Sequence, residues 1–278
     1  VVALGTSLPE LVVSVIASLN GQPDLAVGNA VGSNLFNITV ILGIAALVAT
    51  LPIRGMVVKL EWPVMFLASV ACVLVSRDGV IDRLEAATFL AALVAFVAYS
   101  VHLARREVTA EEASGLAAEV AHLTIRSPGK EAALAVAATV GGIALLILGG
   151  KALVVGAVTL AEAAGMSERF IGLTVVAAGT SAPELATSVM AALRKQSDIA
   201  VANLIGSNVF NILGILGVAG IILPLQVSPD LLHHDMAWMV GTAVLLLVLM
   251  VVRKSLSRPD GLILLAAYGG YFVSLLRG

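Results

Sequence analysis

Long apolar stretches separated by short polar turns make up almost the whole chain. The hydrocarbon core of a bilayer is about 30 Å thick and takes about 20 apolar residues in a helix. The composition agrees with such spans, because 59% of the residues are hydrophobic and only 12% are charged, whereas soluble domains carry about 25% charged residues. The sequence therefore predicts an all-α integral membrane protein in a lipid bilayer.

Nine stretches are long and apolar enough to be predicted spans, and turns such as NGQPD at 20–24 separate them. The predicted spans cover residues 1–20, 24–49, 57–76, 80–104, 131–164, 168–193, 198–222, 234–252 and 261–276. We expect the boundaries to shift by a few residues.

Basic residues fall mainly on one side of these spans. The loops on the side of residues 20–24 contain Arg77, Arg83, Arg169 and Arg277. The other side contains Arg54, Lys59, Arg105, Arg106, Arg126, Lys130, Arg194, Lys195, Arg253, Lys254 and Arg258. Because Lys and Arg are enriched in cytoplasmic loops, loop 105–130 is predicted to be cytoplasmic and the C-terminus external. The expected location is the plasma (inner) membrane.

A duplicated motif gives the internal organisation. Residues 5–10 read GTSLPE and residues 179–184 read GTSAPE, so Glu10 and Glu184 are 174 positions apart. VGNAVGSNLFNI (27–38) and VANLIGSNVFNI (201–212) keep the same offset. The two copies lie five predicted spans apart, an odd number, so they cross the membrane in opposite directions. Inverted repeats of this kind are typical of secondary transporters.

The repeat also predicts the domain boundaries. We expect a first inverted repeat at 1–104, a short linker at 105–130 and a second repeat at 131–278. The second repeat begins one span before its motif, so symmetry predicts a further helix ahead of Val1. The full protein is then expected to have two five-helix repeats, with ten spans in full and nine visible here.

The glutamate of each motif is predicted to lie about 15 Å deep in its span. A charge at the bilayer centre costs about 3 kcal/mol or more unless it is compensated. Two carboxylates at this depth repel each other unless a cation lies between them or protons neutralise them. A divalent cation matches the two negative charges.

Oxygen-bearing side chains recur beside these glutamates at a spacing of four residues, which places each pair on one helix face. The pairs are Thr6 and Glu10, Thr180 and Glu184, Ser33 and Asn37, and Ser207 and Asn211. Pro9 and Pro183 also leave nearby backbone carbonyls without their usual helical donor. Such a set, without His or Cys, favours Ca²⁺ or Na⁺ over transition metals, and Mg²⁺ is disfavoured because it sheds water reluctantly.

The paired sequences GTSLPE…GSNLFN and GTSAPE…GSNVFN resemble the alpha repeats of the sodium/calcium exchanger family, within the cation/calcium antiporter superfamily. The resemblance covers nearly the whole chain and implies alternating access. It implies that Ca²⁺ is bound by Glu10, Thr6, Glu184 and Thr180. It implies that Na⁺ is bound by Glu10, Glu184, Ser7, Ser33, Ser181, Ser207 and the carbonyls of Ala3 and Ala177, with Asn37 and Asn211 completing the cluster.

The function implied is an antiporter that exchanges Ca²⁺ for Na⁺, with no enzymatic activity and no cofactor. Some family members carry Asp at the positions of Asn37 and Asn211, so two amides here argue against K⁺-coupled exchange. An H⁺-coupled Ca²⁺ antiporter using the same carboxylates is the alternative, although the Ser and Asn oxygens suit Na⁺ better. A channel is a further alternative. A hydrolase using Ser7 or Ser181 is disfavoured, because neither serine has a His or Lys base beside it.

Other features exclude several functions. A net charge of −2 gives no electrostatic basis for nucleic-acid binding, and the single cysteine rules out a disulfide framework. No phosphate-binding loop is present, and no obligate protein partner is evident. The sequence HHD at 233–235 is predicted to be a solvated loop, and Trp62 and Trp238 are predicted to be interfacial anchors.

Overall fold

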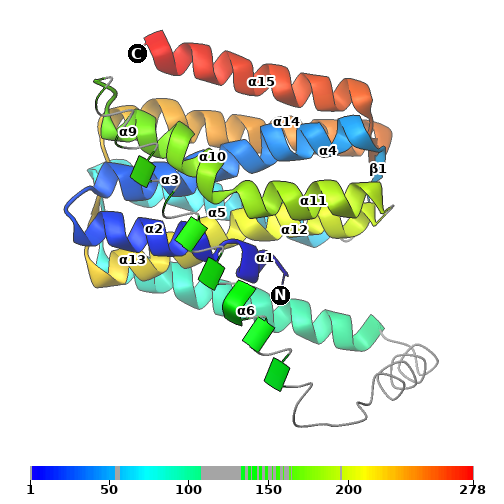
Figure 1. Cartoon of the computed structure of the whole chain (residues 1–278), viewed down its shortest axis with the longest axis horizontal. Coiled ribbons are helices and arrows are strands. Elements are labelled where there is room, and N and C mark those ends of the chain that lie inside the picture. The colour runs from blue at the N-terminus through cyan, green and yellow to red at the C-terminus, as the bar shows by residue number, and fades with distance from the viewer. Residues whose placement is uncertain are drawn as a thin grey trace.

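A computed structural model describes residues 2–53, 57–107, 165–194 and 196–277, with scattered positions between 133 and 163. Most of the predicted span 131–164 and of the linker 105–130 lies outside the described residues. The described helices run largely side by side, with α15 along one edge and α6 along the opposite edge (Figure 1).

The first half begins with a motif span broken at Ser7, followed by a long span and two further spans. The elements are α1 (Val2–Thr6), α2 (Leu8–Leu19), α3 (Pro23–Phe36), the π-helical η1 (Asn37–Ile41), α4 (Leu42–Val48), β1 (Leu51–Pro52), the π-helical η2 (Val57–Glu61), α5 (Trp62–Val75), the 3₁₀ turn η3 (Ser76–Asp78), β2 (Val80–Ile81) and α6 (Arg83–Glu107).

The second half repeats this order after residue 167. The elements are α9 (Glu168–Ile171), the π-helical η4 (Gly172–Val176), α10 (Ala177–Thr180), α11 (Ala182–Leu193), α12 (Ser197–Val209), the π-helical η5 (Phe210–Leu216), α13 (Gly217–Ile222), β3 (Leu225–Gln226), the π-helical η6 (Leu231–Asp235), α14 (Met236–Arg253), β4 (Ser255–Leu256) and α15 (Arg258–Arg277).

The predicted spans agree with these helices. Among the described residues, six helical stretches are long and apolar enough to cross a membrane: Pro23–Val48, Val57–Asp78, Arg83–Leu103, Ala200–Ile222, Leu231–Arg253 and Arg258–Arg277. The pair Arg169–Thr180 and Ala182–Leu193, bent by 46°, makes a seventh, and Leu8–Leu19 is a shorter apolar helix. The prediction of an all-α integral membrane protein is confirmed, and every predicted span outside 131–164 corresponds to a helix or a broken helix.

Two short antiparallel strand pairs show how the halves are related. β1 pairs with β4 through Leu51 and Leu256, and β2 pairs with β3 through Ile81 and Leu225. Leu51 and Leu225 are equivalent in the repeat, because 225 − 51 = 174. A single span, η2 with α5, connects β1 to β2, so the two strand pairs lie at opposite ends of the bundle. Equivalent strands thus lie at opposite ends, which is the arrangement of inverted repeats.

Each motif span breaks at the serine of its GTS sequence. Ser7 separates α1 from α2 with φ −86° and ψ 9°, and Ser181 separates α10 from α11 with φ −83° and ψ 9°. The prolines that follow occupy the first turn of the next helix, where a missing N–H leaves no helical hydrogen bond unmade. The sequence therefore starts a new helix in mid-span, which places the GTS hydroxyls and the glutamate on either side of the break.

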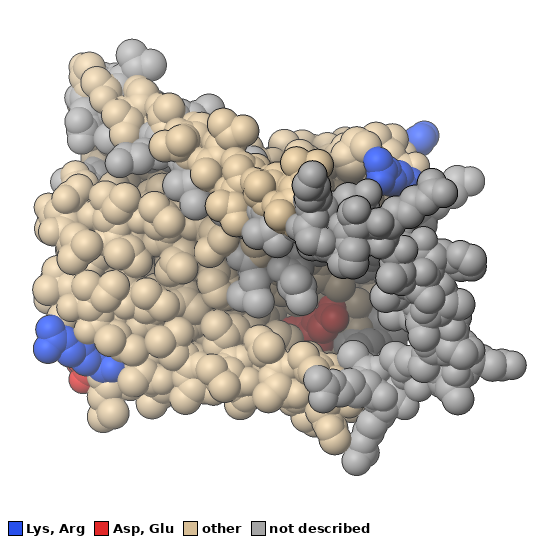
Figure 2. Space-filling view, turned by 60° about the horizontal axis from the view of Figure 1, so that its bottom comes forward, with Lys and Arg blue, Asp and Glu red and all other residues tan. Residues whose placement is uncertain are grey.

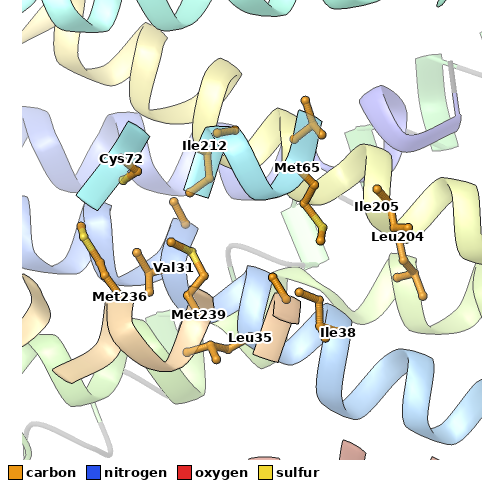
Figure 3. Close-up of a cluster of buried hydrophobic side chains, with 14 of the residues drawn as sticks. Val31, Leu35, Ile38, Met65, Cys72, Leu204, Ile205, Ile212, Met236 and Met239 are labelled. Carbon is orange, nitrogen blue, oxygen red and sulfur yellow. The ribbon is translucent and has the colours of Figure 1, made fainter. Parts of the chain in front are cut away.

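The core lies where the long spans of the two halves meet. Figure 3 shows buried side chains from both halves converging there: Val31, Leu35, Ile38, Met65, Cys72, Leu204, Ile205, Ile212, Met236 and Met239. Backbones also approach closely between α3 and η4, because a Cβ on Gly32 would lie only 2.6 Å from the carbonyl oxygen of Leu173. The two repeats are therefore packed into one body rather than joined only by loops.

The surface is consistent with a lipid environment. Figure 2 shows a face on which nearly all the described surface is uncharged, with Lys and Arg near its edges and an acidic side chain at the floor of a hollow. Leu67, Leu84 and Val94 are among the exposed large apolar residues. In water such a surface favours aggregation, whereas a bilayer solvates it.

The prediction that Trp62 is an interfacial anchor is wrong. Trp62 is only 8% exposed, its ring stacks on Phe66 with centroids 5.0 Å apart, and its Nε1 donates to the carbonyl of Ala243 at 2.8 Å. Trp238 packs against Tyr271 with centroids 5.7 Å apart. Both indoles thus contact neighbouring helices, a role that depends on tertiary packing.

Candidate cation site

The two motif glutamates are buried and face each other across the two repeats. Glu10 on α2 and Glu184 on α11 are both fully buried. Ser7 donates to Oε1 of Glu184 at 2.9 Å, and Ser181 donates to Oε1 of Glu10 at 3.0 Å. Because each serine lies three residues before the glutamate of its own repeat, these reciprocal bonds bring both carboxylates into one site.

Six buried side-chain oxygens around these glutamates have no hydrogen-bond partner among the described residues. They form three pairs whose members are 174 positions apart: Oε2 of Glu10 and Glu184, Oγ of Ser33 and Ser207, and Oδ1 of Asn37 and Asn211. A buried polar atom left without a partner costs about 1–3 kcal/mol. Carboxylate, hydroxyl and amide oxygens are ligands for hard cations, so the set fits a cation substrate.

Asn34 and Asn208, which the sequence analysis did not single out, set the orientation of the amide of Asn37. Nδ2 of Asn208 donates to the backbone carbonyl of Asn34 at 3.4 Å, and a carbonyl only accepts hydrogen bonds. Oδ1 of Asn208 is therefore the atom that accepts Nδ2 of Asn37, at 2.9 Å. With its N–H group used in this way, Asn37 keeps Oδ1 unpartnered.

The same chain of bonds occurs in the other repeat. Nδ2 of Asn34 donates to the carbonyl of Asn208 at 3.2 Å, and Oδ1 of Asn34 accepts Nδ2 of Asn211 at 3.0 Å. Both ligand candidates thus keep their amide oxygens unpartnered. The asparagine of GSN, which is Asn34 in one copy and Asn208 in the other, was detectable in the sequence, because GSN occurs in both copies at the offset of 174.

Replacing Asn34 or Asn208 with alanine is expected to weaken cation binding about tenfold. The change frees the amide of Asn211 or Asn37 to rotate, so the ligand oxygen is no longer held in place, at a cost of about 1–1.5 kcal/mol. The measurement is a binding isotherm for Ca²⁺ on each purified variant. Thr39→Val is the control, since Thr39 is buried nearby and bonds only the carbonyl of Leu35 in its own helix turn. Unchanged affinity in both alanine variants would contradict the orienting role.

The hydroxyls of the two motif threonines lie within hydrogen-bond distance of backbone carbonyls. Thr180 lies within hydrogen-bond distance of the carbonyls of Val176, at 3.0 Å, and Ala177, at 3.3 Å. Thr6 donates to the carbonyl of Ala3 at 3.3 Å. The Thr180 hydroxyl also lies 3.2 Å from Oδ1 of Asn29, and because it has a single proton it donates to one of these three acceptors at a time.

The carbonyls of Ala3 and Ala177 are already hydrogen-bonded. Ala3 accepts the backbone N–H of Ser7 at 3.1 Å, and Ala177 accepts that of Ser181 at 3.0 Å. Each carbonyl also lies within reach of the threonine hydroxyl three residues on. A role for these carbonyls as Na⁺ ligands therefore requires the threonine hydroxyl to turn away.

A second buried charged cluster lies at the start of α14 and corrects the prediction for HHD. Asp235 is fully buried in η6 rather than in a solvated loop. Arg169 donates to it through Nε at 2.6 Å, and Tyr271 donates through its hydroxyl at 3.2 Å. The sequence did not indicate this, because Arg169 lies 66 positions before Asp235. The ion pair between Arg169 and Asp235 connects the beginning of the second motif span to the start of α14.

The site and fold together define a class. Broken helices meeting in the core of an apolar bundle, with two opposed carboxylates and paired neutral oxygens, are features of a membrane transporter for small cations. The model of the sodium/calcium exchanger protein family matches residues 1–102 and 134–277, and the chain belongs to this family. Members of this family are exchangers rather than enzymes, and the ions that they transport are substrates rather than cofactors.

Similar proteins support this family assignment. A putative antiporter, CaxA, from Alkalimonas amylolytica is 38% identical over 98% of this chain and 84% of its own length. The inner membrane protein YrbG of Escherichia coli is also 38% identical, over 99% of this chain and 83% of its own length. A solved structure of the sodium-calcium exchanger NCX_Mj, soaked with Na⁺ and Sr²⁺, superposes with a TM-score of 0.74 at 27% identity, covering 98% of this chain and 84% of the other.

Proposed function

We propose that this antiporter exchanges Ca²⁺ for Na⁺ across a membrane by alternating access at the site between Glu10 and Glu184. The observation that carries the proposal is the set of six unpartnered buried oxygens, three from each repeat. Ca²⁺ takes 6–8 oxygen ligands, so neither repeat alone completes a site and both repeats are needed. Two carboxylates balance the charge of one Ca²⁺ ion.

Na⁺ is the favoured counter-ion because of the neutral oxygens. Once Ca²⁺ has left, protons neutralise the carboxylates but do not use the unpartnered oxygens of Ser33, Ser207, Asn37 and Asn211. Na⁺ bound among such oxygens compensates the carboxylates when Ca²⁺ has left. Exchange of Ca²⁺ for H⁺ remains the second candidate, because the two glutamates alone suffice for it.

An outward-directed Na⁺ gradient is expected to drive ⁴⁵Ca²⁺ uptake into proteoliposomes containing this protein. An equal K⁺ gradient is the matched control and is expected to drive none, because Asn37 and Asn211 add no further acidic group. If a pH gradient drives uptake and a Na⁺ gradient does not, the proton alternative replaces the Na⁺ assignment.

We propose the following topology and location, on the distribution of basic residues. The linker 105–130 is cytoplasmic, the C-terminus is external, and the membrane is the plasma (inner) membrane. The name of the Escherichia coli relative, an inner membrane protein, supports this location. The division into repeats at 1–104 and 131–278 is part of the same proposal and is supported by the reciprocal strand pairs.

A further inference from the structure

Asn29 on α3 connects the two repeats directly beside the cation site. It is fully buried, and its Nδ2 donates to the backbone carbonyl of Glu10 at 3.2 Å and to Oγ of Ser14 at 2.9 Å. Its Oδ1 lies 3.2 Å from the hydroxyl of Thr180, in the second repeat, and is one of the acceptors within reach of that hydroxyl. One side chain thus fixes the backbone of one candidate ligand and the hydroxyl of another.

The equivalent residue in the second repeat makes none of these bonds. Asn203 on α12 corresponds to Asn29, since 203 − 29 = 174, and Ser188 on α11 corresponds to Ser14 in the same way. Asn203 is 7% exposed, and neither its Oδ1 nor its Nδ2 has a partner among the described residues. Oγ of Ser188 is likewise buried and unpartnered.

Other bonds between the repeats do not show this asymmetry. The serine–glutamate bonds and the Asn34–Asn208 bonds occur in both directions. The counterparts of the Asn29 partners are among the described residues, because α11 and α12 contain Ser188, Asn203 and the carbonyl of Glu184. The two repeats therefore carry equivalent candidate ligands, but only the ligands beside Asn29 are hydrogen-bonded by an asparagine of this pair.

A buried amide with no partner is costly, because its donor and acceptor have both lost water. Such a group is tolerated when another state of the protein satisfies it. In inverted-repeat transporters the repeats move against each other around a fixed site, and the two access states of a symmetric pair are related by exchanging the conformations of the repeats.

We propose that Asn29 and Asn203 are alternating positioning residues. In this state Asn29 holds Ser14, Thr180 and the carbonyl of Glu10. In the opposite access state Asn203 holds Ser188, Thr6 and the carbonyl of Glu184, while Asn29 releases its partners. The proposal rests on the proposed function in one respect, since it needs two access states around the site.

Hydrogen–deuterium exchange on the purified full chain tests this without measuring transport. Asn29→Ala removes the bonds of the present state and is expected to shift the equilibrium towards the other state by about tenfold. Exchange of the α2 and α3 peptides then rises, while exchange of the α11 and α12 peptides falls. Asn203→Ala is expected to do the opposite, and the double variant is expected to return towards the wild-type balance.

The response of the distant repeat separates an alternating role from a structural one. If each alanine raises exchange only in its own repeat and leaves the other unchanged, the proposal is wrong. Ser14→Ala and Ser188→Ala are milder variants that keep the test decisive where an asparagine variant does not fold, and they are expected to shift exchange in opposite directions by a smaller factor. Ser69→Ala, which removes a buried hydroxyl bonded only within α5, is the control. Failure of Na⁺-driven Ca²⁺ flux in the wild type would contradict the proposed function and leave this exchange result intact.

Discussion

Glu10→Gln and Glu184→Gln are each expected to abolish Ca²⁺ transport while the protein remains folded. Glutamine keeps the shape of the side chain but removes one of the two charges that balance a divalent ion. The serine bonds from the opposite repeat persist, because the amide oxygen still accepts Ser181 or Ser7. The measurement is gradient-driven Ca²⁺ flux beside a Ca²⁺-binding isotherm and a thermal unfolding curve for each variant.

If the two glutamates share one site, further results are expected for variants at these positions. The double variant is expected to transport no worse than either single one, because either change already leaves the site one charge short. Aspartate at either position keeps the charge but withdraws the oxygens by one methylene, so it is expected to weaken transport without necessarily ending it. If Glu184→Gln kept near-normal Ca²⁺ flux while Glu10→Gln lost it, the protein would have two unequal sites instead of one symmetric site.

Gly32→Ala is expected to destabilise the folded protein severely. The added Cβ would lie 2.6 Å from the carbonyl oxygen and 2.7 Å from the Cα of Leu173, both backbone atoms. Overpacking of a well-packed interior costs about 1–3 kcal/mol and sometimes more, and a backbone cannot be relieved by rotating one side chain. We expect a markedly lower yield of folded protein and a lower Tm.

Gly206→Ala is the matched control, since Gly206 occupies the equivalent position in the second repeat. There the nearest atom to an added Cβ is the Cβ of Ala3 at 3.3 Å, a contact that a shift of a few tenths of an ångström relieves. We expect this variant to change the free energy of unfolding by less than about 1 kcal/mol. Equal loss of stability in both variants would show that the close approach of α3 to η4 is not what makes Gly32 necessary.

The spans and the duplicated motif could be read directly from the sequence, and the candidate ligands were predicted from that motif. Apolar runs of bilayer length leave the backbone no alternative to helices, so the spans were readable from composition and spacing. The offset of 174 between Glu10 and Glu184 follows from the printed residues alone, and an odd number of intervening spans gave the inversion. The proline of each motif also marked where its helix would break, because proline restricts its own backbone locally.

The hydrogen-bond partners of these residues could not be predicted from the sequence, because they depend on how distant helices pack. Asp235 and Trp62 were misassigned because burial depends on partners far along the chain, Arg169 in one case and Ala243 in the other. The orientation of the amide of Asn37 depends on the side chain of Asn208 in the opposite repeat, which donates in turn to the backbone carbonyl of Asn34. The difference between Asn29 and Asn203 could not be predicted from the repeated motif, because both copies carry asparagine at this position and only the packing decides which one finds hydrogen-bond partners.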